Sequence, residues 1–168
     1  AAALRLEATL GQAVCLAQAG EGERGVKLIE QVLAQAPAED ALLHAKAYNR
    51  LGECYRLAKA PREAVLAYLH VDLVYFQNAD AHAEAHLGAV DAALCMARAA
   101  LRETARWIDD NPQSSPQLPV RRLRAQVEVA VDSVLAHVGR GLGATPFCRD
   151  SHFARLAADL PVFVRQSH

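Results

Sequence analysis

One stretch, AYNRLGECYRLAKAPREAVLAY at residues 47–68, constrains the fold more than any other part of this 168-residue chain. It predicts two short helices joined by a turn at Lys59–Pro61, because proline fits the first turn of a helix, where its missing N–H costs little. Tyr48, Leu51 and Tyr55 are spaced three and four residues apart, so they share one face of the first helix. A helical pair of this kind cannot bury its apolar faces alone, and the sequence therefore predicts further helices packed against it.

Composition and charge narrow the class of protein. Ala and Leu are abundant and aromatic residues make up 5% of the chain, which favours an all-α fold. The net charge of −1 gives no indication of a nucleic-acid partner or of an anionic membrane surface. No apolar run reaches the roughly 18–20 residues that span a bilayer. The cysteines form no CxxC pair, so we expect no zinc site or disulfide framework, but reduced thiols in a cytoplasmic protein; they are Cys15, Cys54, Cys95 and Cys148.

Helical periodicity and chain breakers predict the remaining elements. Before the central stretch, residues 2–19 and 23–35 form a helical pair, with a break at Gly20-Glu21-Gly22. After it, no breaker occurs between Ala81 and Ile108, which predicts one long helix. The sequence then predicts a loop at Asn111–Pro119, a helix over 120–138 ended by Gly139, Gly141 and Gly143, and a short helix over Ser151–Ala158, with helical structure disrupted at Pro161.

The first half of the chain resembles the tetratricopeptide repeat. The family pattern places an aromatic residue, Leu-Gly, Tyr, Ala, a second aromatic residue and a small residue at fixed spacing, and here these fall on Tyr48, Leu51-Gly52, Tyr55, Ala64, Tyr68 and Val71. Phe76 stands where the family usually has a closing proline. The resemblance covers residues 6–86 approximately and implies two repeats in a domain of residues 1–80. It implies a non-catalytic scaffold that binds a partner peptide or helix in the repeat groove.

A polar stripe runs beside the apolar face of the central helix. Its members are spaced three, four and three residues apart and therefore share one side of the helix; they are Lys46, Asn49, Glu53 and Arg56. In tetratricopeptide repeats this stripe faces the groove, so the resemblance implies partner binding here. Lys46, Asn49 and Arg56 offer donors for a carboxylate of the partner. The alternative is a solvated face with a weak ion pair.

The second half of the chain resembles a different family. Stretches such as AALCMARAALRETARWIDDNP and VRRLRAQVEVAVDSVLAHVGRGLGATPFCRD, within residues 87–168, are similar to the C-terminal helical bundle of acyl-CoA dehydrogenase-like flavoproteins. In that family the bundle supports FAD and contributes to a tetramer interface. The resemblance implies, for residues 81–168, a helical hairpin and tail that would be inactive without the family's other domains. No Glu occurs after Glu128 to match the family's base, so no catalytic residue is assigned and FAD is expected only under this alternative.

The two resemblances meet near His82–Gly88, and the sequence leaves open a natural fusion, a designed chimera or an assembly artefact. The partner class expected from the first half is a protein or peptide, and a homo-oligomer is also left open. Beside a binding scaffold and a flavoprotein fragment, a third possibility for function is a composite or designed helical chain with no evolved function.

Two histidines, His82 and His86, are four residues apart, a spacing that can present two imidazoles to a metal. Glu84 lies midway between them, which is not the HExxH order of a zinc protease. The sequence alone favours histidines that bind no metal. The dense apolar run at residues 66–76 favours core packing, with an exposed groove for a partner helix as the alternative.

Overall fold

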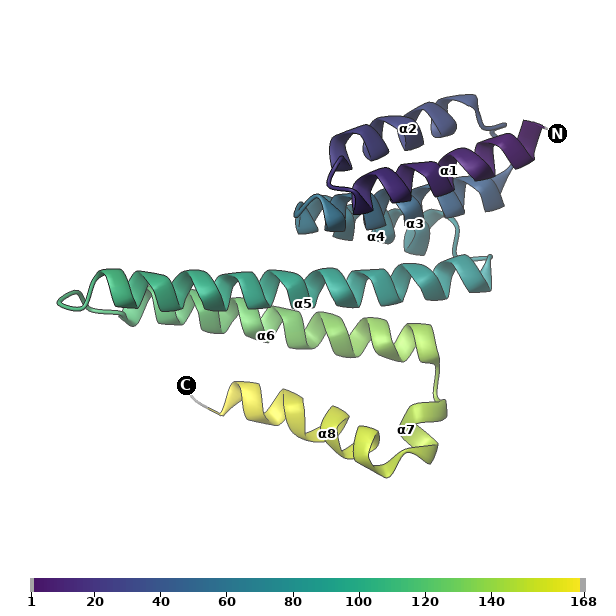
Figure 1. Ribbon diagram of the computed structural model, residues 1–168. Helices are drawn as coiled ribbons and strands as arrows, with labels where there is room; N and C mark the ends of the chain where they lie inside the picture. The colour runs from purple at the N-terminus through teal and green to yellow at the C-terminus, as the bar shows by residue number, and fades with distance from the viewer. Residues whose placement is uncertain (1, 167–168) are drawn as a thin grey trace. The chain divides into compact units, whose positions relative to one another are not determined.

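The computed structural model describes residues 2–166, with side chains from residue 4 onward. Within these residues the chain is all-α, with eight helices and no strand, which confirms the predicted fold class (Figure 1). In chain order the helices are α1 (Ala2–Gln18), α2 (Gly22–Gln35), α3 (Ala41–Leu57), α4 (Pro61–Val74), α5 (Ala79–Asp110), α6 (Gln117–Leu142), α7 (Thr145–Arg149) and α8 (Ser151–Arg165).

The contacts within the chain define two compact units, Ala1–Ala92 and Ala93–His168. The division falls inside α5, so the first turns of this helix belong to the first unit. The sequence placed its domain boundary between residues 80 and 81, and that boundary stays a prediction.

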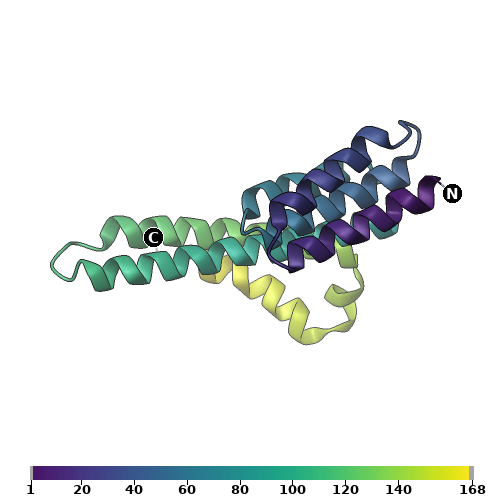
Figure 2. The ribbon, with the colours of Figure 1, turned by 45° about the horizontal axis from the view of Figure 1, so that its top comes forward.

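The first unit is built from two antiparallel helical pairs and the first turns of α5. Helix α1 packs on α2, α3 packs on α4, and α3 also contacts both helices of the first pair (Figures 1 and 2). The turn after α1 uses Gly20 at φ 90°, a left-handed conformation that favours glycine. The turn after α3 places Lys59 at φ 61°, and Pro61 then begins α4 as predicted.

Small residues bring the helices of the first unit close together. An added Cβ at Gly25 would lie 2.5 Å from the carbonyl oxygen of Ala13, so only glycine lets α2 approach α1 this closely. The ring of Tyr68 lies against two further glycines, because a Cβ at Gly52 or Gly88 would come within 2.6 Å or 2.3 Å of it. These contacts position α3, α4 and the start of α5 around one buried aromatic ring.

The second unit contains the rest of α5 together with α6, α7 and α8. Helix α6 continues past Gly139 and Gly141 and ends before Gly143 at φ 65°. The prediction that the helix ends at residue 138 is therefore wrong. The helix can continue because a glycine inside a helix costs only about 1 kcal/mol relative to alanine. Helix α8 likewise continues through Pro161 to Arg165, which corrects the predicted disruption. Proline removes one N–H and bends a helix, but it does not prevent the next turn from forming.

None of the helices in the described part of the chain is long and apolar enough to cross a membrane.

Candidate functional site

A shallow depression of about 250 Å³ lies on the first unit, between α3 and the first turns of α5. Its walls carry five charged side chains, and Tyr68 of α4 forms part of its floor. The depression includes three of the four residues that the sequence assigned to partner binding, Asn49, Glu53 and Arg56. Lys46 does not line it.

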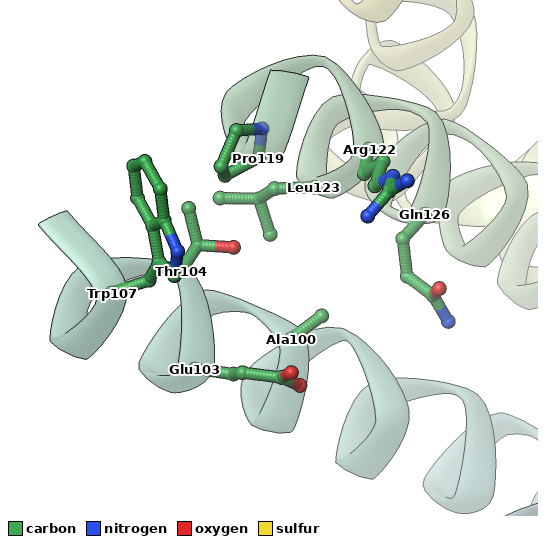
Figure 3. Close-up of a pocket in the computed structure, with 8 residues that line it drawn as sticks. All are labelled: Ala100, Glu103, Thr104, Trp107, Pro119, Arg122, Leu123 and Gln126. Atoms are coloured by element: carbon green, nitrogen blue, oxygen red, sulfur yellow. The ribbon is translucent and has the colours of Figure 1, made fainter. Parts of the chain in front are cut away.

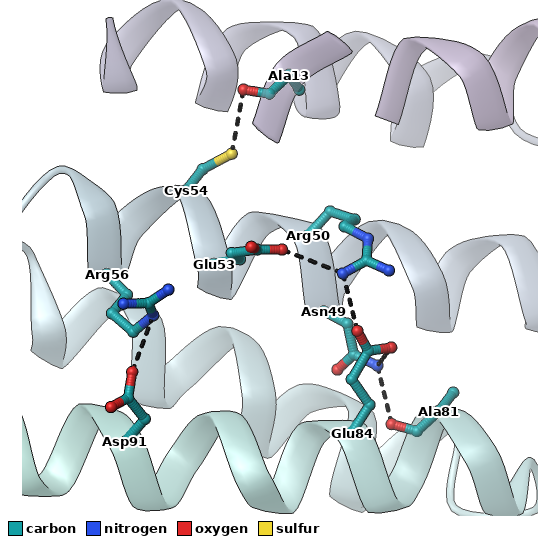
Figure 4. Close-up of polar contacts among 9 residues, drawn as sticks. All are labelled: Ala13, Asn49, Arg50, Glu53, Cys54, Arg56, Ala81, Glu84 and Asp91. Atoms are coloured by element: carbon teal, nitrogen blue, oxygen red, sulfur yellow. Dashed lines mark hydrogen bonds and ion pairs between the residues drawn. The ribbon is translucent and has the colours of Figure 1, made fainter. Parts of the chain in front are cut away.

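The charged side chains of the depression form two sets of ion pairs (Figure 4). The Arg50 guanidinium lies 3.1 Å from Glu53 Oε2 and 2.8 Å from Glu84 Oε1, and so bridges α3 to α5. Arg56 Nε lies 3.1 Å from Asp91 Oδ2. Three carboxylates thus meet two guanidinium groups, which leaves one net negative charge at the depression.

These pairs are only partly shielded from water. The side chains of Arg50 and Asp91 are 39% and 52% exposed. Exposed pairs of this kind contribute about 0–1 kcal/mol each, because solvent screens them and both side chains lose rotational freedom. Opening one of these ion pairs therefore costs the protein little free energy.

Asn49 differs from the other predicted site residues because it is buried, at 1% exposure. Its Nδ2 donates hydrogen bonds to the carbonyl oxygen of Ala81 at 2.8 Å and to Glu84 Oε2 at 3.2 Å (Figure 4). Its Oδ1 has no hydrogen-bond partner among the described residues. Asn49 therefore ties α3 to the first turn of α5, and its amide is already used inside the protein.

Lys46 lies apart from the depression and pairs with Glu7 of α1. The structure therefore brings Asn49, Glu53 and Arg56 together and leaves Lys46 out. All four still share one side of α3, as the spacing predicts.

The sequence did not identify three charged members of the depression, Arg50, Glu84 and Asp91. Arg50 had a local signal, because it lies four residues after Lys46 and three before Glu53. Glu84 and Asp91 are seven residues apart on α5 and share a face. Their placement opposite α3 depends on how α5 packs on α3, and no local sequence pattern predicts how two helices that are not adjacent in the chain pack together.

Two titratable groups near the depression are held in their neutral forms. Burial raises the pKa of Tyr68 to about 12. Burial, with a smaller contribution from the Glu53 carboxylate, raises the pKa of the Cys54 thiol to about 11. Cys54 Sγ lies 3.6 Å from the carbonyl oxygen of Ala13 and donates a weak hydrogen bond to it (Figure 4). Because a thiol is nucleophilic as its thiolate, Cys54 has the character of a structural cysteine.

A second depression, of about 280 Å³, lies within the other unit between α5 and α6. Figure 3 shows Trp107, Pro119 and Leu123 facing one another at one end, with Glu103, Arg122 and Gln126 toward the other. The sequence assigned no site residue here. Its mixed lining offers an apolar contact flanked by both signs of charge.

The outer face of α4 carries large apolar side chains that the core does not cover. Tyr68 and Val71 are buried, as core packing predicts. Leu66 and Leu73, by contrast, are 67% and 74% exposed. The prediction of core packing is therefore confirmed for one side of α4 only.

One group of described residues has the composition of a metal site: Asp72, His82 and His86 place three ligating atoms within 4.8 Å of one another.

Comparison with known proteins adds no relative, since no family model, no curated protein and no solved structure matches this chain. The resemblances to tetratricopeptide repeats and to acyl-CoA dehydrogenase-like flavoproteins stay predictions.

Proposed function

We propose that this chain is a non-catalytic scaffold that binds a peptide or helix of a partner protein at the depression between α3 and α5. The observation that carries this proposal is the partly exposed network of ion pairs around Arg50 and Arg56. Leu87, which is 52% exposed, lies among these pairs and offers an apolar contact. An apolar contact ringed by charged groups is typical of a protein-binding surface.

The charge balance of the depression indicates which partner fits. A partner carboxylate, which the sequence led us to expect, would compete with Glu84 and Asp91 for the two arginines. A partner lysine or arginine would instead meet three carboxylates, of which the two arginines of the depression neutralise only two. We therefore propose a partner segment with a basic residue beside an apolar one.

The arrangement of the helices supports the repeat-like part of the proposal. Two antiparallel pairs precede α5, and Gly52 of α3 and Gly88 of α5 both contact Tyr68 of α4. The same small residue thus occurs on the helix before α4 and on the helix after it, each time at a point of close approach, as in stacked helical repeats. We propose a tetratricopeptide-like scaffold on these grounds, and we propose the cytoplasm as its location because the cysteines show no pairing pattern.

The proposal is tested with a peptide selected on the full chain from a random display library. The synthetic peptide is titrated into wild type, Glu53→Lys and Asp91→Lys by calorimetry. We expect each reversal to weaken binding at least tenfold, because it replaces attraction for a basic residue with repulsion. Glu63→Lys, at an exposed position of α4 away from the depression, is the matched control and should bind as wild type does. Unchanged binding by both reversals would contradict the proposal.

A specific observation keeps the second candidate function open. Helices α5 and α6 of the second unit lie side by side along the depression of Figure 3 and expose large apolar side chains; these include Leu101, Leu118 and Val129. Helices of a larger bundle would carry such side chains toward further helices. The alternative is thus the C-terminal part of an FAD-dependent acyl-CoA dehydrogenase-like oxidoreductase, inactive without its other domains. Flavin absorbance in the purified chain, or FAD binding by fluorescence quenching, would favour this alternative.

A further inference from the structure

Two helices of the first unit bring three metal-ligating side chains together. His82 and His86 lie one turn apart on α5, and their rings are 4.3 Å apart between centroids. Asp72 comes from α4, on the other side of the turn that joins the two helices. The same carboxylate oxygen, Oδ1, lies 2.6 Å from His82 Nε2 and 3.5 Å from His86 Nε2.

The surrounding packing holds this group in place. Tyr68 and Val71 of α4 pack against Ala81 and Ala85 of α5 in one buried cluster. Asp72 comes directly after Val71, so its backbone is fixed by that contact. His86 is 1% exposed, whereas the side chains of Asp72 and His82 are 13% and 25% exposed. The group is therefore preorganised at its base and reachable from solvent at its rim.

The distances fit tetrahedral coordination by a small divalent ion. Zinc bonds of about 2.0–2.2 Å to nitrogen and oxygen place ligand atoms roughly 3.3–3.6 Å apart in a tetrahedron. The distance of 3.5 Å between Asp72 Oδ1 and His86 Nε2 lies within that range. The distance of 2.6 Å to His82 Nε2 is shorter, and a small rotation of the partly exposed His82 would lengthen it. Two imidazoles and a carboxylate suit Zn²⁺, with water in the fourth position, and imidazole also suits Cu²⁺ and Ni²⁺.

We propose that Asp72, His82 and His86 form a binding site for a divalent transition-metal ion, Zn²⁺ fitting best, which joins α4 to α5. The competing account is a group of polar side chains in which Asp72 and His82 simply share a hydrogen bond. The two accounts differ in one respect, which is whether the full chain takes up metal through these three side chains.

The test is titration of the metal-free full chain with Zn²⁺ by calorimetry, together with thermal unfolding with and without Zn²⁺. We expect one ion per chain and a rise in Tm on binding, because an ion that binds only the folded chain stabilises it. Asp72→Asn and His82→Gln, at the two partly exposed ligands, should each weaken binding at least tenfold while circular dichroism shows an intact fold. His152→Gln, at an exposed position of α8, is the matched control and should bind as wild type does.

Co²⁺ provides a spectroscopic test that does not depend on any variant. We expect visible ligand-field absorbance of a four-coordinate ion bound by nitrogen and oxygen, which Zn²⁺ abolishes by displacement. Thiolate-to-cobalt charge-transfer absorbance would instead assign the ion to a cysteine and overturn the proposal. Absence of Zn²⁺ binding, or binding by Asp72→Asn and His82→Gln equal to wild type, would also overturn it.

Discussion

At the scale of single residues, the Tyr68 ring determines which positions of the first unit accept no side chain. Alanine at Gly52 or Gly88 would place a Cβ within 2.6 Å or 2.3 Å of this buried ring. We expect each substitution to lower the free energy of unfolding by about 1–3 kcal/mol, since overpacking forces the ring or a helix to move. Chemical denaturation measures the change.

Gly11→Ala is the matched control, because the position lies within α1 with nothing within 4 Å of an added Cβ. It should raise the free energy of unfolding by about 0.5–1 kcal/mol, the ordinary gain of alanine over glycine in a helix. Equal effects at Gly11, Gly52 and Gly88 would contradict the close contacts with Tyr68.

His70 gives the first unit a dependence on pH. Its ring centroid lies 3.9 Å from that of Tyr48, and burial, with a smaller contribution from the nearby His44, lowers the pKa of His70 below its usual 6.5. As the pH falls through about 6.5, the unfolded chain binds a proton that the folded chain does not, so stability decreases. On acidification, His70 therefore lowers the free energy of unfolding from about pH 6.5 downward, and this loss is complete once the pH is below the lowered pKa of the folded chain.

Urea unfolding of wild type and His70→Gln, at about pH 7.5 and about pH 5.5, measures whether His70 lowers stability on acidification. The wild type should lose more stability on acidification than His70→Gln does, because glutamine does not titrate. His152→Gln should keep the wild-type dependence, since that residue is exposed on α8. A steeper loss in His70→Gln would show that the pKa of His70 is raised instead.

At the scale of helices, two aspartates stabilise helix starts through their side chains. Asp40 Oδ1 accepts a hydrogen bond from the Leu43 amide at 3.0 Å, and Asp150 Oδ1 accepts one from the Phe153 amide at 3.0 Å. Asp40→Ala and Asp150→Ala should each cost about 1 kcal/mol of helix stability, because an N–H of the first turn loses its partner. Glu39→Ala, beside the first cap but exposed, should have little effect; denaturation monitored by circular dichroism compares them.

The sequence predicted most helices because their signals are local. Spacing and breakers located α1 to α4, and the absence of a breaker between Ala81 and Ile108 correctly predicted one long helix, which the structure extends over Ala79–Asp110. The errors occurred at Gly139 and Pro161, where the chain continues as helix, at Gln117, where α6 begins inside the predicted loop, and at the short helix α7, which was not predicted. A breaker changes helix stability by about 1–3 kcal/mol, and the rest of the helix can outweigh that cost.

The candidate site was predictable only as far as it lies on α3. Helical spacing placed Asn49, Glu53 and Arg56 on one side of that helix, and the structure gathers them at one depression. The sequence did not indicate that Asn49 is buried, because its burial results from contact with Ala81 on α5. Asp72 was missed as a neighbour of the histidines for the same reason, since the alignment of α4 on α5 is a tertiary property.

At the scale of the whole molecule, buried apolar residues are concentrated in the first unit. Both buried clusters lie within residues 10–92, whereas the described helices of the second unit expose many large apolar side chains. We expect limited proteolysis to cut first after residue 110, in the segment before α6 or within α8, while the first unit resists. Mass spectrometry identifies the fragments, and early cuts within α1–α4 would contradict this distribution of the core.

Binding of a partner segment at the depression between α3 and α5 can be observed residue by residue with NMR. Backbone amide spectra of the ¹⁵N-labelled full chain are recorded during titration with the selected peptide. We expect dose-dependent shifts concentrated at residues around Arg50, Arg56 and Leu87, with α1, α2 and α8 unaffected. Shifts confined to the exposed face of α4 or to the second unit, with none on α3, would contradict it.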